Sequence, residues 1–163
     1  MGIKEIMKPK YDGIRLNVSI ISDVHFDKKH PTPEVLYERT GAGFKDMQAS
    51  ESPVDLMAIP GDTTSHGNEE NWNMFVETLQ IARPAKDILV NIGNHDTWGE
   101  DDVYGRYYRM CELTTGHRPD KVYFTRVFGG YTFICIGSEK DVGCGAYISD
   151  EQIAFLDEEL KKA

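Results

Sequence analysis

Three short polar groups in the chain each follow an apolar run. They are Asp23-Val24-His25 after the run ending at Ile21, Gly61-Asp62 near the run ending at Ile59, and Gly93-Asn94-His95-Asp96 after the run ending at Ile92. An apolar run that stops at polar residues is typical of a buried strand of an α/β sheet. Ligands bind at the carboxyl ends of such strands, so we expect the three groups to converge there.

The residue types favour a metal site. Asp23 and His25 are two residues apart, so their carboxylate and imidazole lie on the same side of an extended chain and can approach one cation. Oxygen and nitrogen ligands of this kind suit Mn, Fe or Zn. Asp62 has two oxygens and can bridge two cations, and Asn94 offers a carbonyl oxygen to the second. Two ions about 3.5–4 Å apart activate a water for in-line attack on a phosphoryl group. His95 is then free to contact a substrate.

Alternating strand and helix patterns position these groups. Strands are predicted at Ile14–Ile21, Val54–Ile59 and Ile88–Ile92, with helical patterns at Glu34–Ser50 and Asn68–Ile81. We expect Gly41 and Gly43 to break the first helix into two pieces. The second helix has apolar residues at helical spacing and Asn68 as its cap. The order βαβαβ with short connections predicts parallel strands.

The second half of the chain has a different pattern. We expect a helix at Asp101–Leu113, and strands at Val122–Phe128 and Tyr131–Ile136 joined by the hairpin turn Gly129-Gly130. A Ser-x-x-Gln capping box formed by Ser149 and Gln152 predicts the start of a last helix. Its inner face is predicted to carry Ile153, Leu156 and Leu160.

Composition narrows the function classes. The 163 residues, of which 40% are hydrophobic, suit one domain that spans residues 1–163. The net charge of −9 makes nucleic acid an unlikely partner. A small phosphorylated substrate is compatible with it, because a bound cation reverses the local sign. The three cysteines form no metal-binding or disulfide pattern. No apolar run is long enough for a membrane span or a signal peptide, so we expect no membrane association and a cytoplasmic location.

In this order the three motifs resemble the calcineurin-like metallophosphoesterases, from about Leu16 to the final helix. The segments 61–67 (GDTTSHG) and 148–160 (ISDEQIAFLDEEL) are similar to two further segments of that family. The resemblance implies an α/β fold, a four-layer αββα sandwich with mixed sheets. It also implies that Asp23 and His25 bind the first metal, that Asp62 bridges, and that Asn94 binds the second. His95 would be the proton donor or the transition-state stabiliser at the leaving oxygen, and Asp96 would tune it.

Two further residues are candidates for the pocket lining. His66 lies just past the predicted bridging aspartate and Trp98 just past the last motif. The alternatives are a solvated loop residue for His66 and a packing role for Trp98.

The sequence departs from the family pattern after the last helix. There the family carries further metal-binding histidines, whereas the remaining histidines of this chain are His30, His66 and His117. We therefore expect a C-terminally incomplete sandwich with an exposed sheet that favours self-association. The complete enzyme would hold two metal ions (Mn, Fe or Zn), and this chain one or none.

Two functions stay open at this point. One is a metal-dependent phosphoester hydrolase that acts on monoesters or diesters. The other is a non-catalytic or weakly metal-binding remnant of such an enzyme that serves as a binding or scaffold domain.

Overall fold

A computed structural model of the chain describes residues 16–99 and 101–162, which form a mixed α/β structure. Its helices and strands, in chain order, are β1 (Val18–Ile20), α2 (Pro33–Gln48), β2 (Leu56–Ile59), α3 (Glu69–Ala82), β3 (Asp87–Val90), the 3-10 turn η1 (His95–Thr97), α4 (Val103–Thr115), β4 (Phe124–Phe128), β5 (Tyr131–Cys135) and α5 (Asp150–Lys162).

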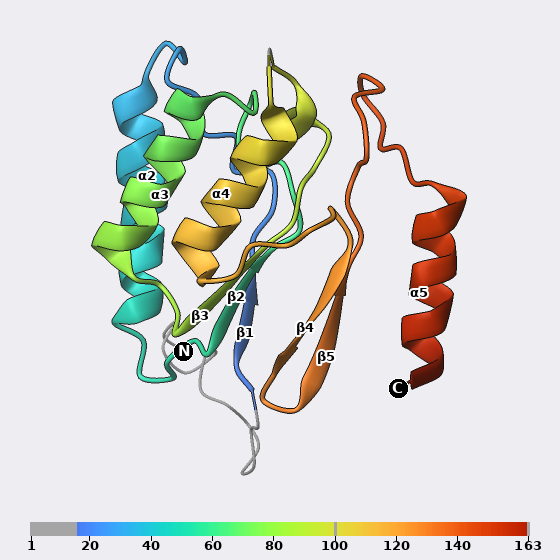
Figure 1. The fold of residues 1–163 in the computed structure, drawn as a ribbon. Coiled ribbons are helices and arrows are strands. Elements are labelled where there is room, and N and C mark those ends of the chain that lie inside the picture. The colour runs from blue at the N-terminus through green and yellow to red at the C-terminus, as the bar shows by residue number, and fades with distance from the viewer. Residues whose placement is uncertain (1–15, 100, 163) are drawn as a thin grey trace.

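The elements lie in four layers (Figure 1). Helices α2, α3 and α4 cover one face of a three-stranded sheet, the β4–β5 hairpin lies on its other face, and α5 lies outside the hairpin. Apolar side chains fill both interfaces of the β1–β3 sheet, and Leu56 and Leu89 pack against Phe128 and Cys135 of the hairpin. The layer order matches the predicted αββα arrangement.

The first sheet has the predicted parallel strands, in the order β1-β2-β3. Register is fixed by Val18 opposite Leu56 and by Ile59 opposite Val90. The three strands are shorter than predicted, and the predicted strand residues 14 and 15 lie outside the described part of the chain. The apolar run that ends at Ile21 is typical of a buried strand, but Ile20 on the edge strand β1 is 70% exposed, so this end of the strand is not buried.

Helix α2 is continuous, so the predicted break at Gly41 and Gly43 is wrong. A glycine inside a helix costs about 1 kcal/mol relative to alanine, which lowers helix stability without ending the helix. Tertiary packing outweighs that cost here, since Phe44 is almost fully buried and Gly41 lies against Thr78 of α3.

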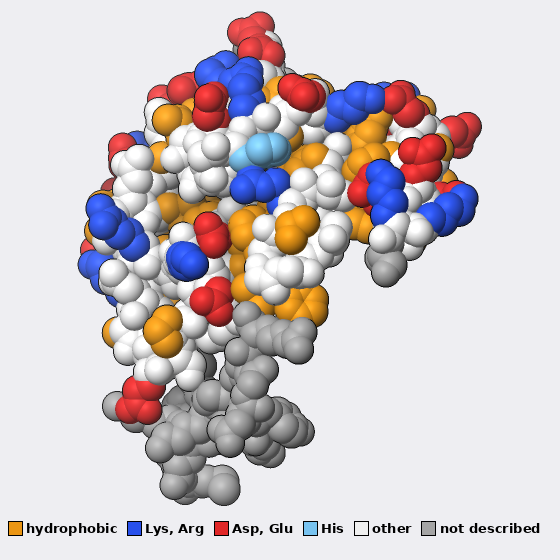
Figure 2. All heavy atoms as spheres, turned by 60° about the horizontal axis from the view of Figure 1, so that its bottom comes forward, with side chains coloured by type: hydrophobic (Ala, Val, Ile, Leu, Met, Phe, Trp, Pro, Cys, Tyr) orange, Lys and Arg blue, Asp and Glu red, His pale blue; other side chains and the backbone are white. Residues whose placement is uncertain are grey.

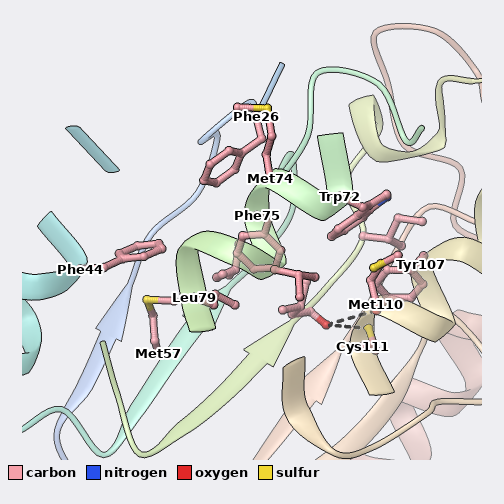
Figure 3. Packing of buried hydrophobic residues seen from close by; sticks show 14 of the residues in the cluster. Phe26, Phe44, Met57, Trp72, Met74, Phe75, Leu79, Tyr107, Met110 and Cys111 are labelled. Atoms are coloured by element: carbon pink, nitrogen blue, oxygen red, sulfur yellow. Dashed lines mark hydrogen bonds between the residues drawn. The ribbon is translucent and has the colours of Figure 1, made fainter. Parts of the chain in front are cut away.

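Helix α3 begins as predicted, because the Asn68 side chain accepts a hydrogen bond of 2.9 Å from the Asn71 main-chain N–H. Its buried face carries Trp72, Phe75 and Leu79, which pack into the core between the helices and the sheet (Figure 3). Figure 3 also shows the contact of this core with helix α4, where the Tyr107 hydroxyl donates a hydrogen bond of 3.2 Å to the carbonyl of Val90.

The hairpin forms at the predicted glycines. Phe128 pairs with Tyr131, and Gly129 and Gly130 between them have φ values of 57° and 84°. Positive φ at both central residues is typical of the two-residue turn that matches strand twist.

At the start of α5, one of the two hydrogen bonds of the predicted capping box forms and the other is replaced. Ser149 Oγ accepts a hydrogen bond of 3.2 Å from the Gln152 N–H, as expected. The Gln152 side chain instead binds both main-chain groups of Gly137, at 2.9 Å and 3.0 Å. The carboxylate of Glu139 takes its place and accepts from the Ser149 N–H at 2.8 Å.

The predicted inner face of α5 is wrong. Ile153 and Leu160 are 54% and 59% exposed. The contacts that hold α5 come from the fully buried Gln152 and from Phe155, whose ring lies 5.1 Å from that of Tyr123. Gln152 and Phe155 therefore set which side of the helix faces the rest of the chain.

Figure 2 views the face at the amino ends of the parallel strands. Acidic and basic side chains are interspersed on this face, and apolar side chains lie between the main body and the lobe formed by α5. Among the described residues, every helix is too short or too polar to cross a membrane.

Replacing Gly43 by alanine should stabilise the protein. An added Cβ at this exposed helix position meets no atom within 4 Å, so the change removes only the conformational freedom of glycine. We expect the free energy of unfolding in urea to rise by about 0.5–1 kcal/mol. An unchanged or lower value would mean that α2 is frayed at this position.

Replacing Gln152 by leucine should destabilise the protein, because the N–H and the carbonyl of Gly137 lose their partner in a buried position. Each buried polar group left unpaired costs about 1–3 kcal/mol. Urea unfolding measures the loss, and Ile153→Ala at the adjacent exposed position is the control, with an expected change within about 0.5 kcal/mol. Equal effects of the two substitutions would contradict the role assigned to Gln152.

Candidate metal centre

The three polar groups converge at the carboxyl ends of the parallel strands. Ligand atoms of His25, Asp62 and His95 all lie within 4.8 Å of one another. Asp23 borders this cluster, with its Oδ1 3.9 Å from Nε2 of His25. The sequence predicted that these groups meet, and it assigned His95 to the substrate; the structure places His95 beside the two predicted metal ligands.

The backbone is strained at three of the predicted metal ligands. Asp23, His25 and Asp62 have φ values of 57°, 52° and 50°, in the left-handed region that side chains other than glycine rarely adopt. Main-chain bonds hold the two loops in this conformation, since the N–H of His25 donates to the carbonyl of Asp62 at 3.1 Å. Strain of this kind concentrates at functional sites, and the sequence pattern did not predict it.

Two glycines allow the ends of β2 and β3 to approach closely. A Cβ on Gly93 would lie 2.2 Å from Oδ1 of Asp62, and a Cβ on Gly61 would lie 2.7 Å from the Cα of Gly93. Only glycine fits at both positions. The close approach places the Asp62 carboxylate against the main chain that carries Asn94 and His95.

Asp96 connects the loops beneath the cluster. Its fully buried carboxylate accepts hydrogen bonds from the N–H groups of Gly93, Thr63 and Thr64, at 2.9, 3.3 and 2.8 Å, and from the Thr64 hydroxyl at 2.8 Å. Burial raises the pKa of Asp96 from 3.8 to about 6, and these hydrogen bonds limit the rise.

Asp96, which the resemblance implied would tune His95, accepts its hydrogen bonds from other residues. The partner of His95 Nδ1 is the carbonyl of Ser65, at 3.2 Å. A proton on Nδ1 satisfies that carbonyl and leaves Nε2 facing outward as an acceptor or a ligand. The His95 ring lies tilted against the Trp98 ring with centroids 3.7 Å apart, and it packs edge-to-face with the His25 ring at 4.5 Å.

Asn94 and Trp98 share one acceptor from a distant part of the chain. The amide Nδ2 of Asn94 and the indole N–H of Trp98 both donate to the carbonyl of Gly143, at 3.2 Å and 3.3 Å. With Nδ2 engaged, the side-chain oxygen of Asn94 is the atom that remains for a metal. His66 is exposed, and its ring lies 5.9 Å from that of Trp98.

Residues that the sequence prediction missed complete this arrangement. Thr64, Ser65 and Gly143 hold predicted site residues through hydrogen bonds. The hydroxyl of Thr64 was a signal for that residue, whereas Ser65 and Gly143 carry none, because each contributes a main-chain carbonyl.

The donor set fits a transition metal. The imidazole of His25 and the carboxylate of Asp62 are ligands that Mn, Fe and Zn accept, Asp23 and Asn94 add oxygen donors nearby, and the His95 imidazole lies beside them. His30 and His117 lie elsewhere: the imidazole of His30 bonds to Thr32, and that of His117 lies against Phe124.

Replacing Asp96 by asparagine should destabilise the protein, because an amide NH₂ would face main-chain donors that now bind a carboxylate oxygen. Each buried donor left unpaired costs about 1–3 kcal/mol. Urea unfolding at pH 8, where the carboxylate is ionised, measures the loss. The exposed Asp46→Asn serves as control, with an expected change within about 0.5 kcal/mol. Equal stability of the two variants would contradict the connecting role of Asp96.

Comparison with known proteins agrees with this site. Residues 16–160 match the model of the calcineurin-like phosphoesterases. The chain is also 30% identical over 99 residues to YkoQ of Bacillus subtilis (strain 168), described as an uncharacterized metallophosphoesterase; the match covers 60% of this chain and 33% of the relative. The chain thus spans about a third of the length of that relative. With nearly all of its described residues matched, the chain belongs to the calcineurin-like phosphoesterase family.

Proposed function

We propose that this chain provides the metal-binding core of a phosphoester hydrolase that uses two metal ions to activate water for in-line attack on phosphorus. Asp23 and His25 would hold the first ion, Asp62 would bridge, and Asn94 would hold the second. The observation that carries the proposal is the convergence of His25, Asp62 and His95 within 4.8 Å. Family membership supports metal-dependent phosphoester hydrolysis in general.

Cations of this type neutralise charge on a phosphoryl group and lower the pKa of water. The chain supplies their orientation. Oδ1 of Asp62 accepts the His95 N–H at 3.0 Å, so the carboxylate cannot rotate freely, and Oδ2 accepts no hydrogen bond within the described part of the chain. This second oxygen is available to a cation.

His95 is placed to donate a proton. Its Nδ1 bonds to the Ser65 carbonyl and its ring is held between His25 and Trp98, so Nε2 keeps one direction. A fixed imidazolium, with protons on both ring nitrogens, can transfer its Nε2 proton to the leaving oxygen as the ester bond to phosphorus breaks, an effect that typically contributes 10²–10⁴-fold to the rate.

The substrate class follows from charge. A net charge of −9 repels polyanions, so we propose a small phosphorylated molecule rather than nucleic acid. Nitrogen and oxygen donors favour Mn, Fe or Zn as the metal.

Loss of the Asp62 carboxylate or of the His95 imidazole should strongly lower the rate of hydrolysis. Protein loaded with Mn²⁺ is expected to cleave an aryl phosphate, and Asp62→Asn and His95→Asn should each lower kcat/KM by about 10²-fold or more. His30→Asn, at an exposed ring that lies away from the cluster, is the matched control and should retain activity. Wild-type rates in both site variants would refute the proposal.

The binding or scaffold alternative has a separate observation behind it. Among the described residues, the first cation has more predicted ligands than the second. Asn94 is the only predicted ligand of the second cation apart from the bridging Asp62. Elemental analysis of the purified chain separates the two functions. Two tightly bound ions support the hydrolase, whereas one ion and no hydrolysis of aryl phosphates support the binding domain.

A further inference from the structure

The loop between β5 and α5 reaches the candidate site from outside its three motifs. It rises beside the segment that follows β3 (Figure 1), and its tip contacts two side chains of that segment. The sequence separation is 49 residues for Asn94 and 45 residues for Trp98. None of the strand-end motifs contains a residue of this loop.

The base of the loop is fixed by its own contacts. The N–H of Glu139 donates to the carbonyl of Tyr147 at 3.0 Å, and the N–H of Tyr147 donates to the Ser138 hydroxyl at 3.0 Å. The ammonium of Lys140 lies 3.6 Å from the centre of the Tyr147 ring. Because these contacts hold the two ends of the loop together, the tip of the loop has a defined position.

The conformation of the tip depends on Gly143. Its φ of 75° lies in the left-handed region, and its N–H donates to the Asp141 carboxylate at 2.8 Å. Its carbonyl then accepts from both Asn94 Nδ2 and the Trp98 indole. A carbonyl has two lone pairs, so one oxygen satisfies both donors.

We propose that Gly143 is a positioning residue of the metal centre: its main-chain carbonyl orients Asn94 so that the side-chain oxygen faces the metal site, and holds Trp98 against His95. This inference rests on the proposed function for the role of Asn94. The hydrogen bonds themselves are independent of any activity. Groups that orient metal ligands typically alter metal affinity by 10- to 100-fold when they are removed.

Two glycines of the loop form a matched pair for the test. A Cβ on Gly143 meets no atom within 4 Å, so Gly143→Val acts through the left-handed backbone alone. Gly145 has no positive φ, and its Cβ would make only an ordinary contact of 3.8 Å with Val142, so Gly145→Val is the control. Asp141→Ala is a milder second variant, because it removes the acceptor of the Gly143 N–H.

The first readout needs no metal. In a ¹⁵N-labelled full-length chain, the two tryptophans give two indole N–H signals, which Trp98→Phe assigns, and Asn94→Ala assigns the amide signal. Gly143→Val should shift the Trp98 and Asn94 signals and speed hydrogen exchange of the Trp98 indole. The signal of buried Trp72 should stay unchanged, which shows that the variant is folded.

The second readout is Mn²⁺ affinity by titration calorimetry. We expect a loss of about 10- to 100-fold for Gly143→Val, a smaller loss for Asp141→Ala, and none for Gly145→Val. Unshifted Asn94 and Trp98 signals in Gly143→Val, or shifted signals with unchanged affinity, would overturn the proposal. Failure of the wild type to bind Mn²⁺ would overturn the role in metal binding and the proposed function, whereas the signal shifts would still establish the contact with the loop.

Discussion

The buried carboxylate of Asp96 is the interaction on which the arrangement of the site depends. It binds main-chain N–H groups that follow β2 and β3, and so fixes the spacing of the two loops that carry Asp62 and His95. A carboxylate suits this place because it offers acceptors only, and four donors surround it. The close contact of Gly61 with Gly93 also fixes the spacing of the two loops, because no side chain separates the ends of β2 and β3.

The predicted site residues around Asp96 are oriented mainly by hydrogen bonds that involve main-chain groups, rather than by hydrogen bonds between their own side chains. His95 is oriented through the Ser65 carbonyl and the Asp62 carboxylate, and Asn94 through the Gly143 carbonyl. Three of the predicted ligands, Asp23, His25 and Asp62, also have left-handed backbone conformations. A site built in this way has its donors in place before a cation binds, so little conformational entropy remains to be lost on binding. The fold supports this with a core on the helical side of the sheet and a smaller one on the hairpin side.

The errors of the sequence predictions have identifiable causes. Gly41 and Gly43 did not end α2, because packing against α3 outweighs a cost of about 1 kcal/mol per glycine. Ile153 and Leu160 have helical spacing but are exposed, because Gln152 fixes the orientation of α5 through Gly137. The family resemblance implied that Asp96 tunes His95, whereas its side chain accepts hydrogen bonds from the neighbouring loop. In each case a contact distant in sequence outweighed a local pattern.

The sequence by itself determined the parallel direction of the three strands, the hairpin turn and the residues that meet at the strand ends. These follow from periodicity of two or 3.6 residues, from turn glycines and from strand direction, which are local properties. Only the tertiary structure decided how the ligands are oriented. That orientation comes from main-chain N–H and carbonyl groups, such as those of Thr63, Ser65 and Gly143, and every residue except proline has both. Because the identity of a residue says little about where its main-chain groups point, the contact of Gly143 with Asn94 and Trp98 becomes visible only once the chain is folded.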